Sequence, residues 1–160
     1  MQKMTIKLQE ALQQAQQTAT RSSHPELKDV HVLLELLQQE GGIVVPILES
    51  AGVDLVKLKA GIVSALASET SVTGSNAEPQ PSYGLRSILD EADLARKSMG
   101  DDFISVEHFL IGALKSGSPT GKILKENGLD TATLEQALKV VRGSQKVTDE
   151  DPEGKYQSLE

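Results

Sequence analysis

The sequence HVLLELL at residues 31–37 returns as HFLIGAL at residues 108–114, displaced by 77 positions without a gap. The same displacement superposes Leu8 on Leu85, and after the loss of one residue in the second copy the match continues to Leu134. The chain is therefore a tandem duplication. Because the repeat is longer than the units of about 34 to 47 residues found in solenoids, each copy is predicted to be a small helical bundle with the duplicated segment as its core.

The composition favours helices packed on helices. The 160 residues include no Trp, two Phe and two Tyr, so a core must be built from Leu, Ile, Val and Ala. The complete absence of Cys excludes disulfide bonds and thiolate zinc sites. The predicted fold class is all-α.

Apolar residues recur with helical spacing in both copies. In the first copy the second helix is predicted to end at Gly41 and Gly42, and a short third helix to run from about residue 43 to residue 50. Predicted N-caps are residues whose side-chain oxygens can accept hydrogen bonds from the first helical turn. They are Thr5, Asp54, Ser105 and Asp130.

Two four-helix repeats are predicted, at residues 1–69 and 83–143, joined by a linker at residues 70–82 that is rich in Ser, Thr, Gly and Pro. Residues 144–160 are polar and acidic, and we expect a partly disordered tail there. The two repeats are expected to form one compact eight-helix domain. It should be monomeric, because each copy can bury its apolar stripes within its own bundle.

The net charge of −7 argues against a nucleic-acid partner, since the sequence has no basic patch with aromatic residues between its cations. No segment approaches the roughly 18 apolar residues of a membrane span, so no membrane insertion is expected. The chain is expected to be cytoplasmic.

Residues 117–122, GSPTGK, look like a phosphate-binding loop. A loop of that type needs four residues between its glycines and a Ser or Thr after the lysine, whereas here there are three residues and Ile123 follows. ATP is therefore not expected to bind within this chain.

His31 and His108 occupy equivalent positions in the two copies. With no Cys and no second ligand at a fixed spacing, we expect structural histidines near helix starts and no metal site. His24 precedes His31 by seven residues, but Pro25 interrupts any helix between them, so this spacing does not predict that the two side chains meet.

An acidic cluster in the second copy admits three interpretations. It comprises Asp90, Glu91, Asp93, Asp101, Asp102 and Glu107. Paired carboxylates in a water-excluding pocket would be the acid and base of a small free-standing hydrolase. Exposed carboxylates would instead form a solvated surface or a surface that recognises a partner. The hydrolase interpretation requires a pocket with at least two buried carboxylates.

Several phrases resemble the N-terminal domain of the ClpB disaggregase family. They are GDDFISVEHF at residues 100–109, EGG at residues 40–42 and YQSLE at residues 156–160. The related ClpC domains share the double repeat but carry Thr-Glu-His in both copies, whereas this chain has DVH at residues 29–31 and VEH at residues 106–108. The resemblance therefore favours ClpB, and an adaptor-docking domain of a ClpC- or ClpA-type unfoldase is the alternative.

This resemblance implies the N-terminal domain of a hexameric, ATP-driven disaggregase that cooperates with the Hsp70 (DnaK) system. The domain would bind unfolded or aggregated polypeptide weakly and pass it to the ATPase ring. ATP and Mg²⁺ would belong to ATPase modules that follow residues 144–160, and the domain itself would have no cofactor and no catalytic activity.

The resemblance also implies a set of substrate-binding residues. Thr5, Asp101 and Glu107 match family positions implicated in substrate handling, while Glu91, Ala95 and His108 align with leucines of a shallow apolar groove, near Leu94 and Phe109. We expect Asp101 and Glu107 to be exposed and to select positively charged chains. Replacing both by alanine should then leave the fold intact.

Overall fold

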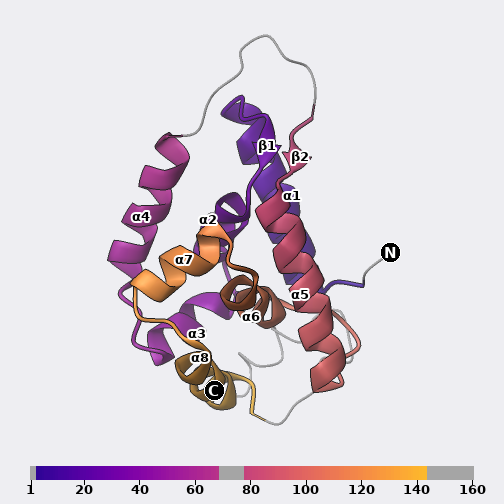
Figure 1. The fold of residues 1–160 in the computed structure, drawn as a ribbon, viewed down its shortest axis with the longest axis vertical. Helices are drawn as coiled ribbons and strands as arrows, with labels where there is room; N and C mark the ends of the chain where they lie inside the picture. The colour runs from indigo at the N-terminus through magenta and orange to yellow at the C-terminus, as the bar shows by residue number, and fades with distance from the viewer. Residues whose placement is uncertain (1–2, 69–77, 144–160) are drawn as a thin grey trace.

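The computed structural model of the chain describes residues 3–68 and 78–143, and within them eight helices form (Figure 1). The first copy contributes α1 (Ile6–Arg21), α2 (Asp29–Gln38), α3 (Val44–Ser50) and α4 (Leu55–Ala67). The second copy contributes α5 (Tyr83–Met99), α6 (Val106–Ser116), α7 (Pro119–Glu126) and α8 (Thr131–Val141). The predicted all-α class with two four-helix repeats is confirmed. The predicted acidic tail lies outside the described residues.

The predicted N-caps are confirmed at all four positions. Asp54, for example, accepts hydrogen bonds from the backbone N–H groups of Val56 and Lys57 at 3.1 and 3.2 Å. The end of α2 differs from the prediction, because the helix stops at Gln38 and the left-handed Gly41 (φ 69°) belongs to the turn that follows.

Two short strands join the C-terminal end of the linker to the first copy. β1 (Glu26–Leu27) pairs in parallel with β2 (Gln80–Pro81), and the backbone N–H of Ser82 donates to the carbonyl of Leu27 at 2.9 Å. Ser82 also caps α5. The last residues of the predicted 70–82 linker are therefore ordered structure, and residues 69–77 lie outside the described part of the chain.

The two copies share one core. α3 packs on α8, while α2 and α4 pack on α7, so the second pair of helices in each copy contacts the other copy. A single cluster of buried apolar residues runs through all eight helices. Asp29, at the start of α2, accepts a hydrogen bond from the backbone N–H of Thr120 in α7 at 2.8 Å, which adds a buried polar tie between the copies. The expectation that each copy buries its own stripes is thus wrong.

The short third helix of the first copy shows this sharing. α3 has 7 residues and buries Val44, Ile47 and Leu48, and it packs on α8 of the other copy as well as on α2 and α4 of its own. Within the described residues no helix is long and apolar enough to cross a membrane.

The N-cap of α8 gives the fold a pH dependence. Hydrogen bonds from the backbone N–H and the hydroxyl of Thr133 hold the pKa of Asp130 below its ordinary 3.8. A lowered folded pKa means that this carboxylate contributes stability above pH 3.8, and that the contribution is lost as the pH falls through the folded value. We therefore expect the melting temperature of Asp130→Asn, whose side chain can still cap, to fall less between pH 5 and pH 3 than that of the parent. Equal falls in a calorimetric comparison would contradict this.

Candidate functional site

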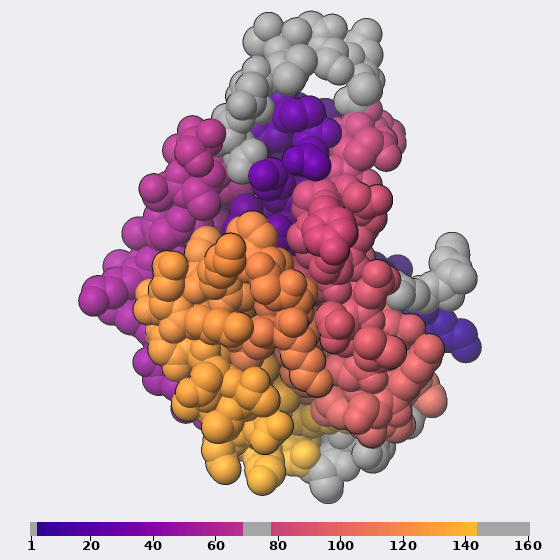
Figure 2. All heavy atoms as spheres, in the orientation of Figure 1, coloured from indigo at the N-terminus to yellow at the C-terminus, as the bar shows by residue number. Residues whose placement is uncertain are grey.

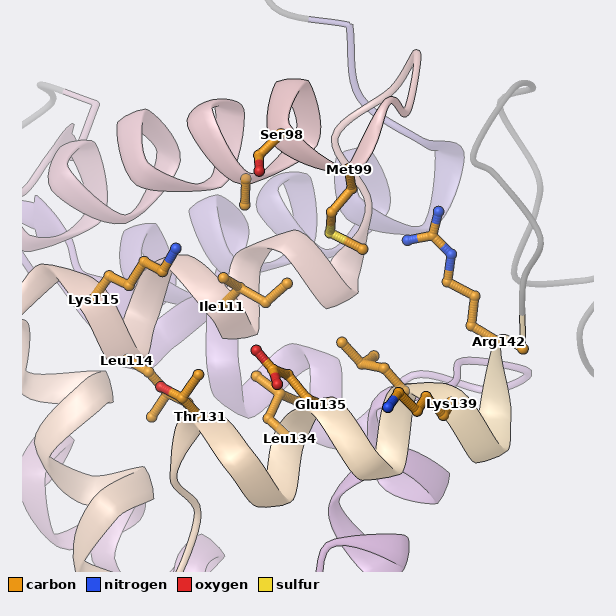
Figure 3. Close-up of a pocket in the computed structure, with 13 residues that line it drawn as sticks. Ser98, Met99, Ile111, Leu114, Lys115, Thr131, Leu134, Glu135, Lys139 and Arg142 are labelled. Atoms are coloured by element: carbon orange, nitrogen blue, oxygen red, sulfur yellow. The ribbon is translucent and has the colours of Figure 1, made fainter.

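A groove of about 430 Å³ lies where α8 faces the C-terminal half of α5 and α6 (Figure 3). Most of its lining surface is apolar. It includes Ala95, Met99, Ile111, Leu114, Leu134 and Leu138. The exposed charges around it are two lysines and one carboxylate: Lys115 and Lys139 lie towards opposite ends, with Glu135 between them (Figure 3). The groove therefore presents an apolar surface with exposed cations beside it.

A buried polar cluster lies beside this groove, formed by the loop between α5 and α6, the first turn of α6 and Arg142, which follows α8 and also lines the groove. Its members are each at most 6 % exposed, and they are Asp101, Ser105, Glu107, His108 and Arg142. The backbone N–H of Ser105 donates to Nδ1 of His108 at 2.8 Å, so the ring proton is on Nε2, which donates to Oδ2 of Asp101 at 2.7 Å.

Arg142 supplies the positive charge of this cluster. Its guanidinium pairs with Asp101 and lies 3.4 Å from Oε2 of Glu107. Because Arg142 follows the last residue of α8, it ties the end of that helix to the loop between α5 and α6. The same loop holds the start of α1, since Ile104 exchanges backbone hydrogen bonds of 2.9 Å with Lys3 and Thr5.

Ser105, His108 and Asp101 include the residue types of a hydrolase triad, and two carboxylates of the acidic cluster are buried. The hydroxyl of Ser105 lies 3.1 Å from Nδ1 of His108 but donates its hydrogen to Oε1 of Glu107 at 2.6 Å. All three residues are at most 3 % exposed, and none lines the groove. A nucleophile must face a bound substrate. The geometry therefore does not support the hydrolase interpretation.

The exposed position expected for Asp101 and Glu107 is wrong. Both carboxylates are buried because Arg142, 41 and 35 positions away in sequence, folds back over them. The charge selection assigned to them would have to come from other residues. The exposed carboxylates of the cluster are Asp90 on α5 and Asp102 in the loop. Asp93 is half-buried and pairs with Arg96 and Lys97 at 2.8 and 3.5 Å.

The other predicted site residues do not form one surface. Thr5, His108 and Phe109 are fully buried, and Phe109 belongs to the apolar core. Leu94 is exposed on α5 and Glu91 is half-buried, but neither lines the groove. Only Ala95 lines it.

Histidines at helix starts behave as expected. His31 and His108 are each the third residue of a helix, and each accepts a hydrogen bond from the backbone N–H of the N-cap, at 2.8 Å in both copies. The structure also gives His24 a role that its spacing did not predict, since its Nδ1 lies 2.9 Å from Nε2 of His31. Within residues 3–68 and 78–143 no three His, Asp or Glu side chains gather as a metal site.

Arg142 is the residue that sequence reasoning missed. The duplication contained a signal for it: displaced by 76 positions, Arg142 matches Leu66, and displaced by 77 positions, Asp101 matches His24. The second copy therefore carries a charged pair where the first has an aliphatic residue and a histidine. Charged residues that replace apolar ones at equivalent positions of a repeat are candidates for a buried pair.

Comparison with known proteins identifies the fold and the family. Residues 3–127 match the Clp repeat N-terminal domain. The chaperone ClpB of Bacillus cereus is 37 % identical over 160 residues, covering 98 % of this chain, while the chain spans 18 % of the length of that relative.

Solved structures agree with this assignment of the fold. The N-terminal domain of Hsp104 from Candida albicans superposes with a TM-score of 0.82 at 18 % identity, over 95 % of this chain and 99 % of that one. A complex of the ClpV N-domain with a VipB peptide superposes with a TM-score of 0.58 at 22 % identity, over 86 % of this chain and 78 % of that one. The chain therefore belongs to the Clp repeat N-terminal domain family, as the N-terminal domain of a ClpB-type Hsp100 chaperone.

Proposed function

We propose that this chain is the substrate-engagement domain of an ATP-dependent, hexameric protein disaggregase, and that the groove between α5, α6 and α8 holds segments of unfolded protein. The observation that carries the proposal is the mainly apolar lining of a groove of about 430 Å³. The ClpV N-domain, which has the same fold, was solved with a bound peptide, and this supports peptide binding as a use of the fold.

Binding is weak in this proposal. The groove is open and its described lining contains no aromatic side chain, so few anchors hold a segment in place. An unfolded chain also loses conformational entropy when it is ordered. We expect a Kd of about 10 µM to 1 mM, which corresponds to about 4 to 7 kcal/mol. Weak binding suits a domain that hands its substrate to a translocating ring.

The ring, its ATP and its Mg²⁺ belong to modules outside this chain, and the chain has no catalytic activity of its own. The whole protein would act in the cytoplasm with the Hsp70 (DnaK) system on aggregated polypeptides. An adaptor-docking role, as in a ClpC- or ClpA-type unfoldase, is less well supported, because the B. cereus relative is a ClpB chaperone.

Charge selection in the groove would come from its exposed ionic residues. Lys115 and Lys139 line it together with Glu135, whereas Asp101 and Glu107 face Arg142. The two buried carboxylates therefore cannot give the domain the expected preference for positively charged chains.

The test is to replace Ile111 by serine, which removes an aliphatic side chain from the centre of the groove. Losing about 1 to 1.5 kcal/mol of apolar contact should weaken the binding of a labelled, permanently unfolded protein by about five- to tenfold, as measured by fluorescence anisotropy. Val140→Ser is the matched control, because Val140 is 76 % exposed on α8 but does not line the groove.

Circular dichroism should show that both variants remain folded. Unchanged affinity of Ile111→Ser would place substrate binding elsewhere on the domain. Failure of the parent chain to bind unfolded protein at millimolar concentration would overturn the proposed function itself.

A further inference from the structure

The outer face of α4 carries an apolar stripe that the fold does not use. α4 packs on α2, α3 and α7 and buries only Leu58 and Ile62. On its opposite side Val56 is 80 % exposed and Val63 is 51 % exposed. Ala60 and Ala67 are exposed as well. These four residues follow each other at spacings of four, three and four, so they form one straight row on the helix.

Two lysines flank this row. Successive residues of a helix turn by about 100°, which places Lys57 on one side of the row and Lys59 on the other. Both are exposed, neither has an ion pair with any other described residue, and residues 55–67 contain no Asp or Glu. The neighbouring Asp54 is occupied as the N-cap. In a chain with 23 acidic and 16 basic residues, this face is apolar and cationic.

The second copy shows that the repeat does not require such a face. α8 is the equivalent helix, and the residues equivalent to the stripe are Ala132, Gln136 and Lys139 on α8 and Gly143 just beyond it, all exposed. The same structural position is therefore mostly polar or small in one copy and lined with valine in the other. In Figures 1 and 2, α4 lies along one edge of the molecule, on the side of α2 and α7 away from α5.

We propose that the outer face of α4 docks an acidic amphipathic α-helix of another protein. The spacing of the row is that of the contact positions of a two-stranded coiled coil, and Lys57 and Lys59 fall at the flanking positions whose charges select the partner. A partner with aliphatic contact positions and glutamates beside them would complement both features.

A second copy of α4 fits poorly. Its flanking positions are Lys57, Lys59, Ser64 and Leu66, so it offers no carboxylate to either lysine. The row also spans only about 16 Å of helix, at a rise of about 1.5 Å per residue. A contact this short buries far less than the roughly 800 Å² per partner of a stable interface. The contact should therefore be transient, with a Kd of about 100 µM.

Two synthetic 21-residue helices test the proposal by NMR titration of the ¹⁵N-labelled chain. The acidic probe has Leu at the contact positions and Glu at the flanking positions, and the basic probe has Lys in place of Glu. We expect the acidic probe to shift the amide signals of residues 55–67 and to bind at least fivefold more tightly than the basic probe. Lys57→Glu combined with Lys59→Glu should reverse this preference.

Val56→Ser combined with Val63→Ser should weaken the acidic probe at least fivefold, while the control Val140→Ser on α8 should leave its affinity unchanged. All the altered side chains are more than half exposed or are surface lysines, so the variants are expected to fold. The proposal is overturned if the acidic probe shifts the groove residues Ile111 and Leu134 instead of α4. It is also overturned if charge reversal leaves the affinities unchanged.

Discussion

Replacing Arg142 by alanine is expected to lower the free energy of unfolding by about 3 to 5 kcal/mol. Arg142 is 6 % exposed and neutralises Asp101 and Glu107, which are 3 % and 0 % exposed. Its loss leaves two carboxylates in the interior without their cation. Urea denaturation at pH 7, followed by circular dichroism, measures the change.

A matched control for this prediction is Lys139→Ala. Lys139 lies in the last turn of α8, three residues before Arg142, but is exposed, so its loss should change the free energy of unfolding by less than about 0.5 kcal/mol. Adding Asp101→Asn and Glu107→Gln to an Arg142→Met background should recover part of the loss, because no buried charge is then left uncompensated. A loss below about 1 kcal/mol for Arg142→Ala would mean that water reaches the cluster.

This cluster also reverses an expectation for the two carboxylates. If they were exposed, replacing both by alanine would leave the stability of the fold unchanged. Because both are buried, the same double replacement leaves the charge of Arg142 uncompensated. Reduced substrate binding in such a variant would therefore report a disturbed fold at the end of α8. The groove variant Ile111→Ser tests binding more directly, since Ile111 lines the groove and does not belong to the buried cluster.

Replacing Gly121 by alanine is expected to destabilise the domain by about 3 kcal/mol or more, at the upper end of the range for overpacked cores. A Cβ atom at this position would lie 2.1 Å from the carbonyl oxygen of Ala113, and backbone atoms of α6 cannot move aside as a flexible side chain would. Gly112 makes a similar close approach, since its Cβ would lie 2.5 Å from the carbonyl oxygen of Ile88 in α5.

Gly61→Ala is the matched control for this effect. Gly61 lies inside α4, and nothing outside the neighbouring backbone of its own helix lies within 4 Å of its Cβ position. Alanine should therefore stabilise the domain by about 0.5 to 1 kcal/mol through its higher helix propensity. Both variants can be compared by thermal melts and urea denaturation. Equal stability of Gly121→Ala and the parent would show that α6 and α7 separate easily.

This close approach of the helices explains one difference between the two copies. Glu35 in the first copy occupies the place of Gly112 in the second, and it remains half-buried with a hydrogen bond from the hydroxyl of Thr18 at 3.0 Å. The second copy has Ala95 at the position equivalent to Thr18. There α5 approaches α6 so closely that a Cβ atom at position 112 would lie 2.5 Å from the carbonyl oxygen of Ile88 and 2.9 Å from the backbone nitrogen of Ala92. The sequence shows that the two positions differ, but the close approach of the helices explains why.

The helices, their N-caps and the duplication could be predicted because they depend on residues close together in the chain. An N-cap such as Asp130 bonds a residue three positions away, and an apolar stripe repeats every three or four residues. The structural role of His31 and His108 follows the same local rule, since each bonds the backbone three residues earlier.

Features that join distant parts of the chain were decided by the tertiary structure alone. The burial of Asp101 depends on Arg142 at the end of another helix, and the tie between Asp29 and Thr120 spans 91 positions. The groove likewise exists only because α8 packs on α6 and faces α5. Whether a carboxylate is exposed or paired in the interior is set by what packs over it, and no spacing within one segment carries that information.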